Sequence, residues 1–313
     1  NQVAFNFHNY VEETYQPGYA YSSKCKPVDL YIDGEYVGEY LLMEAVEAGK
    51  NRVNIDAENT ANTDILLEID GNGRDVATDA HLDTRTSIYD MFFTINEPEG
   101  PGTSGEAAEI EKFNTEYGAK KQAVMNFLNE FETAVQAKDY TKIQEYIDVD
   151  SFVNFYITSE LFKTKDIGFS STRFYIKDGK LYGGPLWDLD LSAGNSDDGG
   201  LDKYDDLKAK NDNAWFKALL SVPEFEAAVK ARFTELLPKI EGLVKAGGDI
   251  DTTYEEVKKA AASNFSVAYN VWSSADNGYR NGWLINGLYG GSEVLGQEMY
   301  GNSVVHDTYE EYI

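Results

Sequence analysis

One predicted β-hairpin near the middle of the chain limits how the residues around it can be arranged. Asp178-Gly179 has the composition of a type I′ turn, because Gly adopts positive φ without strain and Asp does so more readily than most residues. The flanking runs Phe174-Tyr175-Ile176 and Leu181-Tyr182 alternate with polar residues, as half-buried strands do. We therefore expect the chain from residue 166 to residue 195 to fold back on itself.

Carboxylates lie at both ends of this segment. Asp166 precedes the turn by about as many residues as Asp190 follows it, so regular antiparallel pairing would bring Asp166, Asp188 and Asp190 to one end of the hairpin. Carboxylate oxygens are preferred ligands of hard cations, and the pattern predicts such a site. The same residues also suit a plain structural role, with Asp166 in a helix-terminal loop and the other two acids in a turn near Pro185 and Gly194.

The charge balance argues against several classes of partner. The 313 residues carry a formal net charge of −27, and this field repels nucleic acid and anionic membrane surfaces. No apolar run approaches the length of about 18 residues that a membrane-spanning helix needs. Such acidity is common among extracellular proteins. We expect an extracellular or cell-surface protein with no nucleic-acid partner and no membrane span.

The cysteine and histidine residues offer little chemistry. Cys25 is the single cysteine, so neither an intrachain disulfide nor a thiolate metal cluster can form. His8, His81 and His306 share no recognisable motif with it, which argues against a covalent Cys mechanism. The chain begins at Asn1 without Met or a signal peptide, which is typical of a mature piece of a longer protein.

Residues 1–104 are expected to form a strand-rich N-terminal part, and residues 105–313 a mainly helical part that contains the hairpin of residues 166–195. Asp33-Gly34 predicts a second hairpin, and residues 64–70 and 91–95 have the apolar composition of buried strands. A linker rich in Gly and Pro separates the two parts.

The helical part shows apolar residues at steps of three and four. This periodicity predicts a long helix through residues 110–135 and a second helix that is capped near Asp150-Ser151 and ends close to Asp166. Further helices are expected from Asn213 to about Val244 and over residues 253–265. The tail from residue 273 is rich in Gly and Asn and is expected to be irregular.

Several separated motifs follow one another along the chain. They are residues 28–44, VDLYIDGEYVGEYLLME; Asp166 with the strand at Phe174-Tyr175 and Trp187-Asp188-Leu189-Asp190; and the block from Ala214 to Arg232. In this order they resemble the first hairpin, the core and the helices of the family of spore coat protein H, the CotH kinase-like proteins. The resemblance covers roughly residues 20–270 and rests on the order and spacing of these motifs.

The resemblance implies an α+β chain with a divergent protein-kinase-like, two-lobed fold, forming one CotH domain overall. It also implies an atypical phosphotransferase that uses ATP and Mg²⁺ to modify Ser or Thr of a surface or coat protein, either active or attenuated. Asp166 would orient or deprotonate the acceptor hydroxyl, and Asp188 and Asp190 would hold the metal, with Ca²⁺ as a substitute ion.

Further candidates surround these acids. Ser171 stands five residues after Asp166, where kinases place a metal-binding Asn, and the CotH family also has an Asn in this region. A hydroxyl is the weaker oxygen ligand. Arg173 and Lys163 are candidate cations for the nucleotide phosphates, and Glu44 is a candidate acid to pair with such a cation. The plain structural alternatives are an outward-facing strand residue for Arg173, a lysine at a helix end for Lys163 and a surface acid for Glu44.

Two other functions stay open. Paired carboxylates can also cleave glycosidic bonds, so a polysaccharide-associated protein of the cellulosome type is an alternative. A catalytically silent surface or scaffold protein is another, and the hydroxyl of Ser171 favours it over an efficient kinase. The sequence identifies neither the acceptor protein nor the oligomeric state.

Overall fold

The computed structural model describes residues 2–16, 21–71, 80–101, 107–189, 192–193 and 206–261, and the statements below concern this part of the chain. Helices and strands occur together, which confirms the predicted α+β class. In chain order the elements are α1 (Gln2–Tyr15), β1 (Cys25–Ile32), β2 (Glu35–Met43), β3 (Ile65–Ile69), β4 (Phe93–Glu97), α2 (Ala107–Gln136), α3 (Tyr140–Tyr146), α4 (Val149–Leu161), β5 (Arg173–Lys177), β6 (Lys180–Gly183), α5 (Lys208–Asp212), α6 (Ala214–Leu219), α7 (Pro223–Val244) and α8 (Asp249–Ala261).

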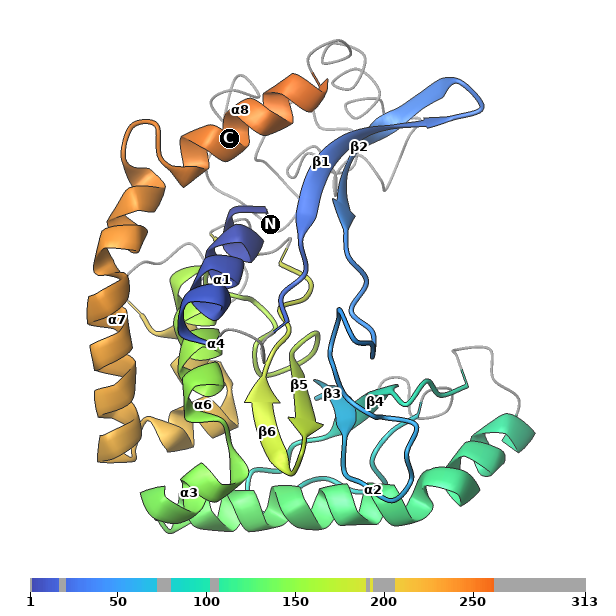
Figure 1. Cartoon of the computed structure of the whole chain (residues 1–313). Coiled ribbons are helices and arrows are strands. Elements are labelled where there is room, and N and C mark those ends of the chain that lie inside the picture. Colours follow the sequence, from blue (N-terminus) through green and yellow to red (C-terminus); the bar gives the residue numbers. More distant parts are fainter. Residues whose placement is uncertain are drawn as a thin grey trace.

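A four-stranded antiparallel sheet, in the order β4-β3-β5-β6, forms the centre of the fold. Helix α2 runs along the lower end of this sheet, and α4 and α6 lie beside β5 and β6 (Figure 1). Strands β3 and β4 precede the predicted boundary at residues 104 and 105, whereas β5 and β6 follow it. The central sheet therefore combines strands from both predicted parts, and the boundary itself stays a prediction.

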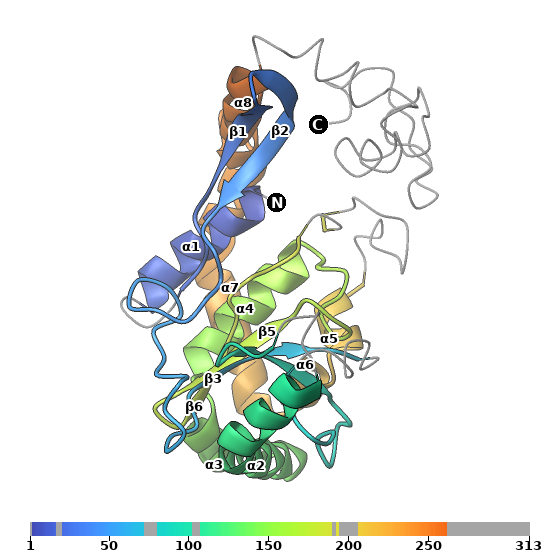
Figure 2. The same ribbon diagram turned by 90° about the vertical axis from the view of Figure 1, so that its right-hand side faces the viewer.

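Strands β1 and β2 form a separate two-stranded sheet. Asp33 and Gly34 have φ values of 52° and 85°, so the predicted hairpin turn is confirmed. This ribbon extends away from the central sheet and runs beside α8 (Figure 2).

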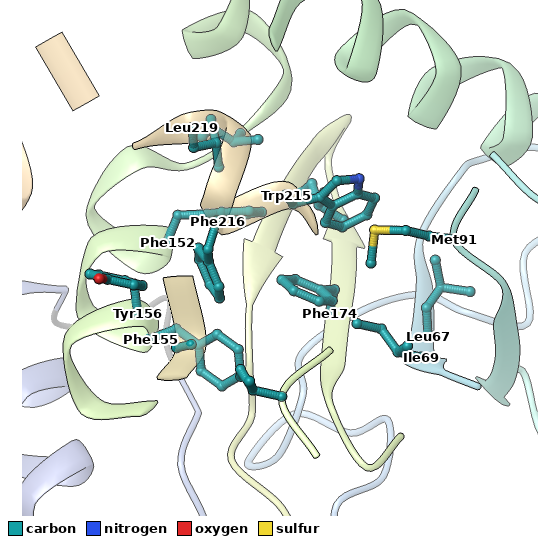
Figure 3. Packing of buried hydrophobic residues seen from close by; sticks show 14 of the residues in the cluster. Leu67, Ile69, Met91, Phe152, Phe155, Tyr156, Phe174, Trp215, Phe216 and Leu219 are labelled. Atoms are coloured by element: carbon teal, nitrogen blue, oxygen red, sulfur yellow. The ribbon is translucent and has the colours of Figure 1, made fainter. Parts of the chain in front are cut away.

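Aromatic side chains fill the space between the central sheet and the helices (Figure 3). Phe174 of β5 points into this core, with its ring centroid 5.0 Å from that of Trp215 in α6 and 5.6 Å from that of Phe152 in α4. Because alternate residues of a strand face opposite sides, Tyr175 lies on the other face of the sheet. There it stacks on Tyr182 at 4.9 Å and packs with Leu66 in a smaller apolar cluster.

Some elements differ from the sequence prediction. Residues 2–15 form helix α1 within the part expected to be strand-rich, because Phe7 and Val11 recur at helical spacing and are fully buried. The helices expected between residues 213 and 244 are α6 and α7, and the division falls where α6 ends at Leu219 and Pro223 begins α7, as Pro at a first helical position does. The tail from residue 273 lies outside the described residues.

The cap of α4 also lies slightly earlier than predicted. Asp148 accepts a hydrogen bond from the backbone N–H of Ser151 at 2.9 Å, so the helix begins at Val149.

None of the described helices combines the length and the apolar character that crossing a bilayer requires.

Candidate functional site

The predicted hairpin is present as β5 and β6. Asp178 and Gly179 have φ values of 49° and 75°, as a type I′ turn requires. The backbone N–H of Asp178 donates to Asp64 Oδ1 at 2.9 Å, which ties the turn to the loop before β3. At the other end, the N–H of Gly184 donates to the carbonyl of Arg173 at 2.9 Å. This open end, away from the turn, is where the predicted site residues were expected.

Asp188 and Ser171 meet at the open end of the hairpin. The Ser171 hydroxyl donates to Asp188 Oδ2 at 2.9 Å. Both residues have positive φ, 53° for Ser171 and 54° for Asp188, and the Asp188 side chain is exposed. The buried side chains of Leu186 and Leu189 hold the segment on either side of Asp188. The hairpin therefore brings two predicted ligand oxygens together.

Asp166 lies in the turn that connects α4 to β5. Its carbonyl accepts from the N–H groups of Phe169 and Ser170 at 2.9 and 3.1 Å and from the Thr172 hydroxyl at 3.2 Å. Its side chain is half-buried. One hydrogen-bonded turn thus carries both Asp166 and Ser171, and the Ser171 end of that turn contacts Asp188.

The start of α6 fixes this turn from the other side. The buried side chain of Asn213 caps α6 through the N–H groups of Trp215 and Phe216, and its amide donates to the carbonyl of Ile167 at 2.7 Å. A side chain at Gly168 would collide with the Asp212 carbonyl, so glycine is required at this close approach. The position of Asp166 is therefore set by packing rather than by a free loop.

The described residues supply two oxygen donors to the candidate cation site. Asp188 supplies an exposed carboxylate and Ser171 a hydroxyl, whereas Asp190 lies outside the described residues. Among the described residues no three His, Cys, Asp or Glu side chains are grouped to hold a metal. Mg²⁺ commonly takes one or two carboxylates and completes its shell with phosphates and water, while Ca²⁺ needs 6–8 oxygens.

The two predicted phosphate-binding cations have acidic partners within the protein. Arg173 is only 8% exposed, donates from Nε to Glu68 Oε2 at 2.9 Å and lies over the Trp187 ring at 4.2 Å from its centroid. Lys163 Nζ donates to the carbonyl of Asp206 at 2.9 Å and forms an ion pair with its carboxylate.

Glu44 pairs with an arginine that the sequence analysis did not identify. Its Oε1 accepts from Arg52 at 3.3 Å, and its Oε2 accepts from the N–H of Lys24 at 3.0 Å. About a third of each side chain in this ion pair is exposed, 30% for Arg52 and 33% for Glu44. The sequence signal for Arg52 was an arginine eight residues after Glu44, but no sequence motif connects the two residues.

The segment that carries Arg52 covers the outer face of the central sheet. Val53, the next residue, packs with Leu66 and Tyr175 on that face. Glu68 and Arg173 are a register pair on the same face, because each lies two residues from a member of this cluster. Arg52 and the contact between Arg173 and Trp187 therefore belong to one side of the sheet.

A buried polar cluster lies behind the open end of the hairpin. A side chain added at Gly184 would approach His8 Nε2 at 3.9 Å, and His8 Nε2 lies 3.9 Å from Glu12 Oε1. Burial lowers the pKa of His8 to about 3. Burial, reinforced by the charge of Asp148, raises the pKa of Glu12 to about 8. Both groups are therefore neutral at pH 7.

The comparison with protein families agrees with this arrangement of motifs. A family model described as CotH kinase protein matches residues 1–284. A comparison with curated proteins gives no match. The matched range includes the β1–β2 hairpin, the central sheet and the turn that carries Asp166. The chain belongs to the CotH kinase family.

Proposed function

We propose that this protein is an extracellular or surface-exposed, Mg²⁺-dependent phosphotransferase with a divergent, two-lobed kinase-like fold. It would transfer the γ-phosphoryl group of ATP to a Ser or Thr hydroxyl of a surface or coat protein. Family membership supports the reaction class. The observation that carries the proposal is the 2.9 Å hydrogen bond between Ser171 and Asp188, because it joins the segment after Asp166 to the segment after the hairpin.

The acids have separate roles in this proposal. Asp166 orients the acceptor hydroxyl and receives its proton as the oxygen bonds to the γ-phosphorus and ADP leaves. Asp188 and Asp190 would hold Mg²⁺, with the Ser171 hydroxyl as a weaker neighbour. When bound there, the ion would supply positive charge that neutralises the phosphates of the nucleotide. Ca²⁺ is the alternative ion at the same oxygens.

We assign the nucleotide phosphates to Arg52 rather than to Arg173 or Lys163. All three cations have acidic partners, Glu44 and Glu47 for Arg52, Asp206 for Lys163 and Glu68 for Arg173. The Arg52 side chain is 30% exposed, whereas those of Lys163 and Arg173 are only 12% and 9% exposed. A planar guanidinium suits bidentate contact with phosphate oxygens. In this proposal Glu44 and Arg52 act as the acid and cation pair of a kinase.

A catalytically silent surface or scaffold protein is the second candidate. The observation that favours it is the hydroxyl of Ser171 beside Asp188, since a hydroxyl binds a second Mg²⁺ less firmly than a carboxamide does. Such a protein would keep the fold and one ion at Asp188 without efficient transfer.

Labelling of a protein substrate with γ-labelled ATP separates these candidates. Wild type is compared with D166N, D188N, D190N and D178N, with folding checked by circular dichroism. D178N is the matched control, because it makes the same chemical change at the turn of the same hairpin, and Asn also fits that turn.

The proposal expects Mg²⁺-dependent labelling in wild type and D178N and its loss in the other three variants. Binding of Mg²⁺ and ATP without labelling of any offered protein would support the silent scaffold. Retention on insoluble glycan, or glycan cleavage without nucleotide, would overturn the kinase proposal in favour of a polysaccharide-associated protein.

A further inference from the structure

We infer that Arg173 is a positioning residue that sets the orientation of the metal-binding segment, and that it does not bind phosphate. Arg173 connects Glu68 in the neighbouring strand to Trp187, the residue before Asp188. The inference rests on the proposed function only in treating Asp188 as a metal ligand.

The ion pair between Arg173 and Glu68 is built into the sheet. These residues are register partners in β5 and β3, and Arg173 Nε donates to Glu68 Oε2 at 2.9 Å. The side chains are only 9% and 19% exposed, so water screens the pair weakly. An arginine in this setting cannot turn to a ligand without leaving the largely covered carboxylate of Glu68 unpaired, which is costly.

The other side of the guanidinium supports Trp187. The Arg173 Cζ atom lies 4.2 Å from the centroid of the Trp187 ring, within the range of a cation–π interaction. Trp187 is half-buried, and the residues that flank it in the chain are Leu186, which is buried, and Asp188, which is exposed. The stacked indole is thus the nearest side-chain anchor preceding the exposed carboxylate.

Two contacts therefore join the start of β5 and the turn before it to the chain that follows β6. Ser171 and Arg173 are two residues apart, and they contact the consecutive residues Asp188 and Trp187. Asp188 has φ 54°, a conformation that is uncommon for residues with a side chain, although Asp adopts it more readily than most. Arg173 holds the residue before Asp188 by contacting Trp187, and Ser171 contacts the Asp188 carboxylate directly.

The geometry requires arginine rather than lysine. A planar guanidinium donates in its plane to Glu68 while its face stacks on the indole. An ammonium group keeps the positive charge but cannot make both contacts in one orientation. The R173K variant therefore separates positioning from phosphate binding, because charge alone would largely preserve a phosphate contact.

The test compares R173K and E68Q with R232K in the full chain. Arg232 is the matched control: its guanidinium lies 3.9 Å from the centroid of the Tyr15 ring, it pairs with Asp150, and its side chain is 12% exposed. The first readout is the emission of Trp187, isolated as the difference between each protein and its counterpart that carries W187F. The second is Mg²⁺ affinity, measured by calorimetry with a non-hydrolysable ATP analogue.

R173K and E68Q should shift the Trp187 emission to longer wavelength and weaken Mg²⁺ binding about tenfold, with R232K unchanged in both readouts. Unchanged Trp187 emission in R173K would overturn the inference, whether or not the protein is a kinase. Near-normal Mg²⁺ affinity in R173K, together with tighter nucleotide binding in E68Q, would also overturn it, because that result identifies Arg173 as a phosphate ligand freed from its acid. If wild type binds no Mg²⁺ and nucleotide, the proposed function fails and the emission readout still decides the role of Arg173.

Discussion

Ser171 donates its hydroxyl hydrogen to Asp188 Oδ2 over 2.9 Å, although Ser171 precedes the β5–β6 hairpin in the sequence and Asp188 follows it. The contact places a weak oxygen ligand beside a strong one. Kinases have an asparagine where this protein has Ser171. The Ser171 hydroxyl donates its single hydrogen to the Asp188 carboxylate.

The S171N variant should bind Mg²⁺ more tightly than wild type, by about fivefold or roughly 1 kcal/mol. A carboxamide oxygen is the better ligand, and Asn tolerates the φ of 53° at this position more readily than most residues. Calorimetry with Mg²⁺ and a non-hydrolysable ATP analogue measures the change. S171A is the companion variant, and identical Mg²⁺ affinity in S171N, S171A and wild type would show that residue 171 is not near the ion.

The R52M variant should weaken binding of ATP about tenfold. It removes the partly exposed guanidinium that Glu44 holds, while the methionine side chain keeps the apolar packing of the stem. Fluorescence or calorimetric titration with ATP gives the affinity. The K50M variant on the same segment is the control, because Lys50 is exposed, and equal losses in both variants would indicate only a general charge effect.

The buried His8 and Glu12 side chains predict an unusual dependence of stability on pH. His8 is neutral in the folded protein down to a pKa of about 3 and charges below 6.5 when unfolded, so its contribution makes the free energy of unfolding rise from pH 3 to 6.5. Glu12 keeps its proton in the folded protein up to about 8 but loses it near 4.5 when unfolded, so its contribution falls over that range.

The contributions of His8 and Glu12 cancel between pH 4.5 and 6.5. Between pH 6.5 and 8 only that of Glu12 remains, so the free energy of unfolding should fall by about 1.4 kcal/mol per pH unit. The charged groups that act on Glu12 are Asp148, Asp150 and Arg232, and they modify the slope without reversing it. Urea unfolding at several pH values measures the curve. The E12Q variant should lack the alkaline fall and the exposed-site control E13Q should keep it, whereas a fall that persists in E12Q would refute the assignment.

The buried ammonium of Lys120 should be a major contributor to stability. Lys120 is 2% exposed and donates to the carbonyls of Ala57 and Asn59 at 2.5 and 3.1 Å and to Asn62 Oδ1 at 3.1 Å. The K120M variant removes the ammonium donor of the Ala57 carbonyl and one of two donors each to the Asn59 carbonyl and to Asn62 Oδ1, and it should lower the free energy of unfolding by roughly 2–4 kcal/mol.

The same loop ends at Asp64, which holds the turn of the β5–β6 hairpin through the backbone N–H of Asp178. Hydrogen exchange at the hairpin should therefore accelerate in K120M. The K112M variant on the exposed side of α2 is the control and should unfold within about 0.5 kcal/mol of wild type. Equal stability of the two variants would contradict a structural role for the buried ammonium.

The sequence predicted those parts of the site that depend on local conformation. The turn at Asp178-Gly179 follows from the φ preferences of two adjacent residues, whereas the contact of Ser171 with Asp188 lies beyond the strand pairing, which ends at Phe174 and Gly183. Helix α1 was missed because its neighbours in the chain are strands, and the general expectation for that part outweighed the helical spacing of Phe7 and Val11.

The partners of the cations could not be predicted in the same way. The ion pairs between Arg173 and Glu68 and between Lys163 and Asp206 join residues that are distant in the sequence, and only tertiary packing brings them together. Arg52 was overlooked for the same reason, since its contact with Glu44 requires the segment after β2 to fold back on itself.

The most direct test of a shared site for metal and nucleotide is calorimetric titration of ATP into wild type, D188N and D178N, with and without Mg²⁺. Saturable binding that requires Mg²⁺ in wild type and D178N and disappears in D188N is the expected result. Absence of binding in wild type, or equal binding in all three proteins, would contradict the proposal that the open end of the hairpin holds a metal and a nucleotide.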